Sequence, residues 1–327
     1  MTLRLKKWLV PPAAVAATAL LAACSSSSSS TTGTTSSSSS ASASASAGSP
    51  TSPADAGLAH AQQTVAKLEA TTSSYPVPAA SVPGVSKLKG RTVFYIPLDA
   101  HIPGFVVTAA TMKTALAKAG LKFQECDGQG NPTAIASCVG QAEGVNAAGI
   151  VLDAIPYGMV QNALPIFKQD CPDCHIVVKP ITASMSDQQI TASVTSNVQT
   201  DPTAQYYYTE FEDSLQDTVS GIQAAGKASS VGIAVAGGSV NGLGLLKSGQ
   251  LVKAVVAVDQ PYAGWALTDE VLRMMTKSGP VTETFPSRLF DATNIGSVQV
   301  TAAAQDSGAW FGDDSYQASF AKLWGVG

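Results

Sequence analysis

The sequence predicts an α/β protein with two doubly wound parallel-sheet lobes, the second of them reduced. From Gly90 onward, apolar runs of strand length alternate with runs of helical spacing, and glycines such as Gly120 and Gly226 end the helices. Such alternation with apolar strands indicates parallel sheets covered on both faces. About 270 residues follow residue 55, which is too many for one small core and suits two lobes.

The first lobe is expected to contain four strands and three helices. A short amphipathic helix over 57–69 and an extended stretch over 75–84 come before it. The expected strands cover 92–98, 121–126, 149–155 and 175–178, and the expected helices cover 104–119, 132–145 and 157–168.

The same alternation continues in the second lobe. The expected strands are 190–194, 205–209, 231–236 and 253–258, and the expected helices are 214–225, 243–248 and 264–277. The last fifty residues contain a turn at Pro286, a short β-rich run over 298–301 and a helix near 315–323.

The N-terminus has the pattern of an export signal. A basic start precedes an apolar run over 8–23, which ends Leu-Ala-Ala before Cys24. Two prolines interrupt the run, and it is short of the roughly 20 residues that a membrane span needs. It resembles the lipobox of bacterial lipoproteins, which implies a lipid on Cys24 and a chain anchored outside the cytoplasm. An ordinary secreted protein and a spanning helix are the alternatives.

Residues 24–55 are almost entirely Ser, Thr, Ala and Gly, which predicts a disordered tether with a mean reach of roughly 30 Å. Removal of the three signal-peptide cations would lower the formal charge from −4 to −7. The sequence has no basic stripe, so nucleic acid is not an expected partner.

Four more cysteines form two close pairs, Cys126 with Cys138 and Cys171 with Cys174. An even count in an exported protein favours disulfides. The second pair belongs to a C-x-x-C-H run, so haem attachment and a redox role are alternatives. It falls in a predicted helix–strand turn, which favours a structural disulfide. The three histidines are scattered, and we expect no metal and no cofactor.

Five segments carry a resemblance to type 1 periplasmic binding proteins, the sugar-type receptors of ABC importers: VFYIPLDAHIPGF, ALAKAGLKFQECDGQGNPT, GVNAAGIVLDAI, YYYTEFED and LLKSGQLVKAVVAVDQPYAGW. The resemblance covers roughly 57–327. It implies two lobes joined by a hinge, with the ligand in the cleft at the carboxyl ends of the strands.

Position by position, the resemblance implies a set of ligand-binding candidates that follow strands: Asp99, His101, Phe105, Asp153, Tyr157, Glu210, Glu212, Asp213, Ser239, Asn241, Asp259, Gln260 and Tyr262. Several have structural alternatives. Phe105 and Tyr262 could be packing residues. Asp153 and the acids of the 210–213 cluster could serve only to favour a helix N-terminus.

The chain departs from the family pattern in two places. Where the family has an Asp-Arg pair after the fourth strand, this chain has Lys179-Pro180-Ile181. We also infer that a helix–strand–helix–strand stretch of the family pattern is missing between Gln199 and Asp201, because only four strands can be placed over 190–258. We therefore expect a shortened second lobe.

The resulting organisation is a signal peptide at 1–23, a tether at 24–55, an N-terminal helix and lead-in at 56–89, lobe one at 90–185, lobe two at 186–280, and a hinge return and tail at 281–327. The expected function is capture of a small polar solute, a sugar or sugar-like compound, for the permease subunits of an ABC importer. The alternatives are a degenerate or sensor-coupled receptor and, third, a secreted hydrolase. The sequence has no G-x-S-x-G elbow, dinucleotide loop or P-loop, and we expect no enzyme activity.

Overall fold

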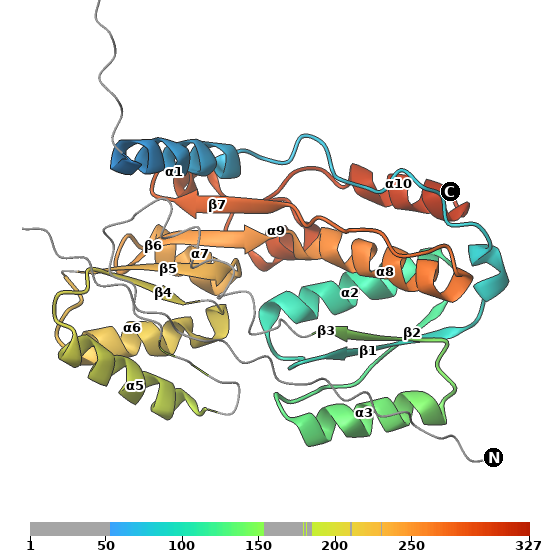
Figure 1. Ribbon diagram of the computed structural model, residues 1–327, viewed down its shortest axis with the longest axis horizontal. Coiled ribbons are helices and arrows are strands. Elements are labelled where there is room, and N and C mark those ends of the chain that lie inside the picture. Colours follow the sequence, from blue (N-terminus) through green and yellow to red (C-terminus); the bar gives the residue numbers. More distant parts are fainter. Residues whose placement is uncertain (1–52, 154–178, 180, 182–184, 210, 230) are drawn as a thin grey trace, which may run out of the picture. The chain divides into compact units, whose positions relative to one another are not determined.

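The computed structural model describes residues 53–153, 179, 181, 185–209, 211–229 and 231–327 (Figure 1). The chain divides into two units, Met1–Ser49 and Pro50–Gly327, and every described residue lies in the second. The described strands form two sheets, here called sheet A and sheet B. None of the described helices is both long and apolar enough to span a bilayer.

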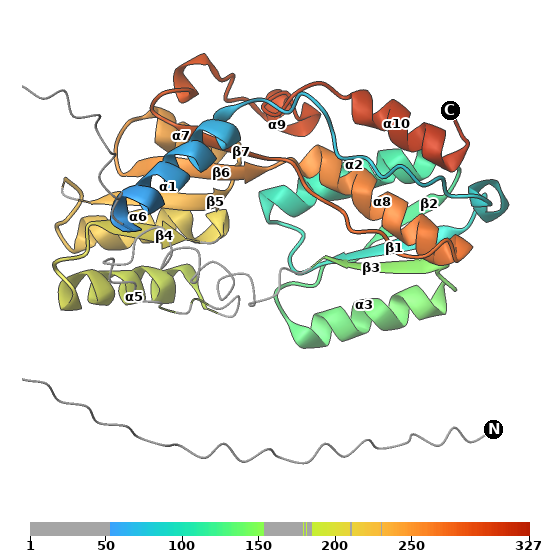
Figure 2. The ribbon, with the colours of Figure 1, turned by 45° about the horizontal axis from the view of Figure 1, so that its top comes forward.

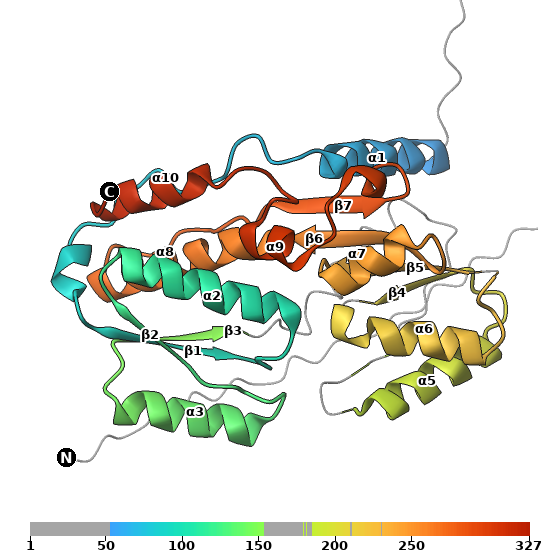
Figure 3. The ribbon, with the colours of Figure 1, turned by 180° about the vertical axis from the view of Figure 1, so that it is seen from behind.

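Sheet A is parallel, with strand order β2-β1-β3. Its central strand β1 (Thr92–Pro97) pairs with β2 (Lys122–Glu125) and β3 (Gly149–Asp153). The chain steps from β1 to β2 on one side and then crosses back from β2 to β3 on the other side of β1. Right-handed crossovers that advance in opposite directions place their helices on opposite faces of the sheet. Accordingly, α2 (Pro103–Lys118) covers one face and α3 (Pro132–Gly144) covers the other (Figure 3).

Sheet B has strand order β4-β5-β6-β7. The strands β4 (Tyr206–Thr209), β5 (Gly232–Gly237) and β6 (Val252–Val258) are parallel, and β7 (Ser287–Asp291) is antiparallel to β6. Every parallel connection here advances in the same direction, so right-handed crossovers put the helices on one face. The helices after β4 and β5 are α6 (Leu215–Ala224) and α7 (Val240–Lys247).

One face of sheet B packs into a single core, in which Ile233, Val235, Val255 and Phe290 are fully buried. α5 (Asp187–Thr200) lies beside α6 (Figure 2) and contributes the buried Ile190, Val194 and Val198 to this core. On the opposite face, the edge strand β4 leaves Tyr206 81% exposed. The described part of the second lobe is therefore wound on one side only.

The helix α8 (Gln260–Thr276) follows β6 along the chain but packs with sheet A. Its most extensive packing contact is with α2, and its buried Tyr262 and Trp265 share a core with Val93 and Met112. The predicted boundary at residue 280 assigned this helix to lobe two, whereas its apolar face completes the core of the first sheet. The chain then returns to sheet B through β7.

Two further helices and four short elements complete the description. α1 (Pro53–Glu69) lies against β7 (Figure 1), and α10 (Ser315–Trp324) packs its aromatic side chains on α8. The others are η1 (Val85–Leu88), η2 (Glu212–Ser214), η3 (Ile295–Ser297) and α9 (Ala302–Ser307).

Two local predictions were wrong. The expected strand at 190–194 is part of α5, because Ser186 and Gln189 form a capping box and apolar residues recur at helical spacing from Ile190. The expected β-rich run at 298–301 is the link between η3 and α9, and the strand of this region is β7, directly after Pro286. The predicted helix at 157–168 and strand at 175–178 lie outside the described residues.

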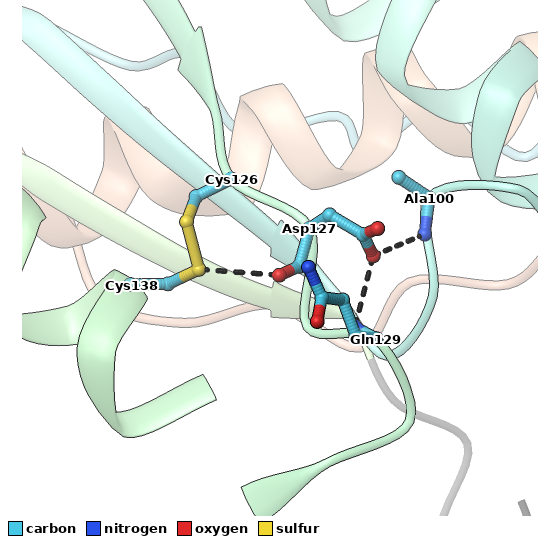
Figure 4. Close-up of a disulfide and its surroundings, with 5 residues drawn as sticks. All are labelled: Ala100, Cys126, Asp127, Gln129 and Cys138. Carbon is cyan, nitrogen blue, oxygen red and sulfur yellow. Dashed lines mark hydrogen bonds between the residues drawn. A yellow bond between two sulfur atoms is a disulfide. The ribbon is translucent and has the colours of Figure 1, made fainter. Parts of the chain in front are cut away.

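The predicted disulfide between Cys126 and Cys138 is present, with Cα atoms 5.7 Å apart (Figure 4). It ties the end of β2 to α3, and Cys138 is buried in a small core with Phe94 and Ile96. Cys24, Cys171 and Cys174 lie outside the described residues.

We predict that replacing both Cys126 and Cys138 with serine lowers the free energy of unfolding by about 3 kcal/mol, the loop-closure entropy of a bridge of this span. Urea denaturation of the mature protein measures it, with Ser137→Ala, an exposed change on α3, as the control that should leave the stability nearly unchanged. An unfolding midpoint unchanged from wild type would contradict a stabilising role for this bridge.

Candidate functional site

The candidate site lies at the carboxyl end of sheet A, beside β1, where the connection to β2 and the later connection to β3 run in opposite directions. In open α/β sheets this switch point is where ligands bind. β1 is followed by Asp99 and His101, β2 by Asp127, and β3 ends at Asp153. Three of these four residues were predicted from the sequence, and the topology brings all four to the same edge.

Asp127 connects the loops after β1 and β2. Its Oδ1 accepts hydrogen bonds of 2.9 Å from the backbone N–H groups of Ala100 and Gln129 (Figure 4). Partial burial acts to raise the pKa of Asp127, but these two donors and His101 hold it below its usual range. The sequence interpretation missed this residue, although an acid directly after a strand was the available signal.

His101 is highly exposed and stands between two carboxylates. Its Nδ1 lies 3.0 Å from Asp99 Oδ1 and 3.6 Å from Asp127 Oδ2. One ligand atom from each of the three side chains falls within 4.8 Å of the others. Such a donor set could hold a divalent cation, but exposed acidic groups are common without one, and we assign no metal to it.

Asp153 is the most enclosed acid at this edge. The buried Tyr95 of β1 donates its hydroxyl to Asp153 Oδ2 at 2.6 Å. Burial raises the pKa of Asp153, and the hydrogen bond from Tyr95 partly opposes that rise. Phe105, by contrast, is 6% exposed in the first turn of α2, so the structure places it among the buried residues.

In sheet B, Glu212 is held by the N-terminus of α7. Its carboxylate accepts from the backbone N–H groups of Gly238 (2.6 Å), Ser239 (2.7 Å) and Gly242 (2.6 Å), and from the Ser239 hydroxyl. A Cβ on Gly242 would lie 2.2 Å from Glu212 Oε1, so this approach requires glycine. Glu212 and Ser239 are thus hydrogen-bonded to each other, and Glu212 accepts from backbone N–H groups at the start of α7 that have no partner within the helix.

Two other candidates of this region remain near the surface. Asp213 lies in η2, where burial raises its pKa, its own neighbour Ser214 N–H opposes the rise, and the charge of Asp99 adds to it. Asn241 is exposed in the first turn of α7. Tyr157 and Glu210 lie outside the described residues.

The candidates at the crossing from β6 to α8 have structural contacts. Asp259 is fully buried, and its Oδ1 caps α8 by accepting from Tyr262 N–H at 3.0 Å; burial raises its pKa to about 6. Gln260 Oε1 accepts from Thr108 Oγ1 at 2.7 Å, which joins α8 to α2. Tyr262 is fully buried and stacks on Tyr75, as the packing alternative predicted.

The structure therefore gathers Asp99, His101, Asp127 and Asp153 at the switch point, with Asp213 within electrostatic reach. A shallow hollow lined by Thr92, Lys113 and Lys122 lies at the amino ends of β1 and β2, the end of a parallel sheet at which ligands are not expected.

Comparison with solved structures identifies the architecture. A sugar ABC transporter protein from Yersinia enterocolitica matches with a TM-score of 0.58 and 14% identity, over 78% of this chain and 100% of that one. This chain has the type 1 periplasmic binding protein fold. The myo-inositol binding protein of Caulobacter, bound to myo-inositol, matches at 0.53 and 12% identity, over 68% of this chain and 98% of that one.

A solute-binding protein from Agrobacterium vitis, bound with α-D-tagatopyranose, matches at 0.51 and 11% identity, over 63% of this chain and 96% of that one. At these identities the likeness concerns the fold. No protein-family model and no curated protein matches the sequence.

We predict that Glu212→Ala lowers the free energy of unfolding by about 3 kcal/mol, because three backbone donors of the α7 terminus lose their acceptor. Urea denaturation measures the loss, and Asp213→Asn, one residue away, serves as the control with a change below about 1 kcal/mol. A Glu212→Ala variant as stable as wild type would contradict a structural role and return Glu212 to the set of ligand contacts.

Proposed function

We propose that this protein is an extracytoplasmic solute-binding protein that captures a small polar, sugar-like ligand for an ABC importer. The observation that carries the proposal is the acidic edge at the switch point of sheet A, in a chain with the type 1 binding-protein fold. The solved structures that share this fold include proteins bound to myo-inositol and to a tagatose.

The site chemistry suits a neutral polyhydroxylated ligand. Carboxylates accept hydrogen bonds from hydroxyl groups, and Asp99, Asp153 and Asp213 offer such acceptors from both sheets. Like charges that face one another across the site disfavour an anionic ligand. Binding in this proposal uses lobe closure about the crossings and involves no covalent chemistry.

A degenerate receptor is the second candidate, because of the one-sided winding of sheet B. Among the described strands of that sheet no reversal of strand order occurs, so no switch point is formed there. The second lobe would then contribute fewer ligand contacts than the first. A panel of sugars and polyols distinguishes the two candidates.

We predict that at least one member of a neutral panel containing myo-inositol, tagatose and common pentoses and hexoses raises the melting temperature of the mature protein. For that ligand, Asp99→Asn and Asp213→Asn should each weaken binding by about 10- to 100-fold, the loss of one hydrogen bond to a charged group. Isothermal calorimetry gives the dissociation constants.

Glu143→Gln, on the exposed side of α3 and away from the switch point, is the matched control and should bind as wild type does. Failure of every panel member to bind would favour the degenerate receptor. Binding that is unaffected by both aspartate variants would place the ligand elsewhere.

We further propose that a lipid on Cys24 anchors the protein to the outer side of the cell membrane, with 25–55 as the tether. The support is the order of basic start, apolar run and Leu-Ala-Ala-Cys in the sequence. A single acyl chain binds membranes only marginally, so stable anchoring needs more than one chain.

We predict that Cys24→Ser moves the protein from the membrane fraction into the soluble fraction and removes labelling by a palmitate analogue. The Cys126→Ser/Cys138→Ser double variant, which removes both cysteines of the disulfide and leaves no unpaired thiol there, should leave both unchanged. A Cys24→Ser protein that remains labelled and membrane-bound would contradict the anchor without affecting the solute-binding proposal.

A further inference from the structure

The segment 277–286 links α8, in the core of sheet A, to β7 of sheet B, and it carries a buried carboxyl group. Both carboxyl oxygens of Glu283 are inaccessible to solvent, and neither has a hydrogen-bond partner among the described residues. A buried ionised carboxylate without a partner is strongly unfavourable, whereas a protonated one is far less so. The position of Glu283 therefore favours its neutral form.

The surroundings of Glu283 add to this preference. On α8 it faces Asp269, Glu270 and Arg273, and the hydroxyl of Tyr262 is also near. Arg273 is the single cation of this group, and its guanidinium already donates to other partners. Its Nε donates to Asp269 Oδ2 at 2.6 Å, and its Nη2 donates to the Ala80 carbonyl at 2.6 Å.

Asp269 is fully buried and held on both oxygens. Trp324 Nε1 donates to its Oδ1 at 2.7 Å, and Arg273 takes its Oδ2. The carboxylate of Asp269 is therefore held in place by two donors, and its negative charge acts on Glu283. A protonated Glu283 is a donor that this anion can accept from, whereas an ionised Glu283 is a second anion with no cation of its own.

We propose that Glu283 is a proton-operated latch that docks the crossing segment 277–286 onto α8 when protonated and releases it when ionised. Lys277 and Ser278 stay bonded to the end of α8, where Ser278 N–H donates to the Arg273 carbonyl at 2.9 Å. The release has a local path, because few hydrogen bonds among the described residues hold the segment beyond Ser278. Val281 N–H donates to Glu270 Oε2 at 3.3 Å, and at the far end Asp259 N–H donates to the Pro286 carbonyl at 2.9 Å.

Burial raises the pKa of Glu283 to about 7, the charges of Asp269 and Glu270 add to the rise, and Arg273 opposes it. The pKa of the unfolded chain lies near 4.5. Because the folded-state pKa is higher, the docked form is fully favoured below about pH 4.5 and is lost progressively as the pH rises from there to about 7. If the crossings act as the hinge, solute affinity should fall over the same range, a consequence that rests on the proposed function.

The test needs no ligand, so its outcome is independent of the proposed function. Hydrogen–deuterium exchange of the peptide covering 277–286, corrected for intrinsic exchange, and the melting temperature are followed from pH 5.5 to 8.5. For wild type we expect the melting temperature to fall and protection to drop about tenfold between pH 5.5 and 7, and both to level off above about pH 7, where the docked and the released carboxyl are both ionised.

Glu283→Gln mimics the protonated state, and we expect its protection of 277–286 to stay high and nearly constant across this range, while its melting temperature keeps only the smaller fall near pH 6 that comes from Asp259. Glu143→Gln, an exposed change of the same kind, should follow wild type. A Glu283→Gln variant with the pH dependence of wild type would overturn the latch. If that variant does not fold, wild-type protection of 277–286 that stays constant from pH 5.5 to 8.5 overturns it equally.

Discussion

The packing of α8 on α2 is the constraint on which the rest of the structure depends. α8 begins where β6 of sheet B ends, yet its apolar side fills the core of sheet A. The two helices approach so closely that a Cβ on Gly264 would lie 2.0 Å from Thr111 Oγ1. Because the same helix is covalently continuous with sheet B at both ends, the two sheets cannot be built as independent domains.

This constraint explains why buried polar groups gather at the crossings. Asp259 is the N-cap of α8, so it must sit at the point where the chain leaves one sheet for the other. The Asp269–Arg273 pair and Glu283 lie near the opposite end, where the chain turns back. Buried ion pairs contribute little net stability but are sensitive to geometry. The crossings are thus the places where a change of charge has the largest structural effect.

The sequence predicted most of the strand–helix alternation because glycine stops and apolar runs are local signals. The prediction was wrong where a tertiary contact decides the secondary structure or the role of a residue. Ile190 and Val194 suit a strand by composition, but the capping box at Ser186 and the contact with α6 select a helix. Tyr262 and Glu212 were assigned to the ligand site by resemblance. In the structure Tyr262 stacks on Tyr75, and Glu212 accepts hydrogen bonds from the N-terminus of α7, contacts that the sequence alone does not reveal. Asp127 was missed because its role depends on the neighbouring loop.

The two sheets differ in one topological respect that bears on function. In sheet A the two connections run in opposite directions on either side of β1, and the resulting switch point at the carboxyl edge brings together Asp99 and Asp153 of the candidate site. In the described part of sheet B the strand order advances in one direction only. The carboxylate of Glu212, which follows β4, is already occupied by hydrogen bonds from the N-terminus of α7. Under the proposed function, most hydrogen bonds to the solute would therefore come from the first lobe, with Asp213 as the principal acidic contact from the second.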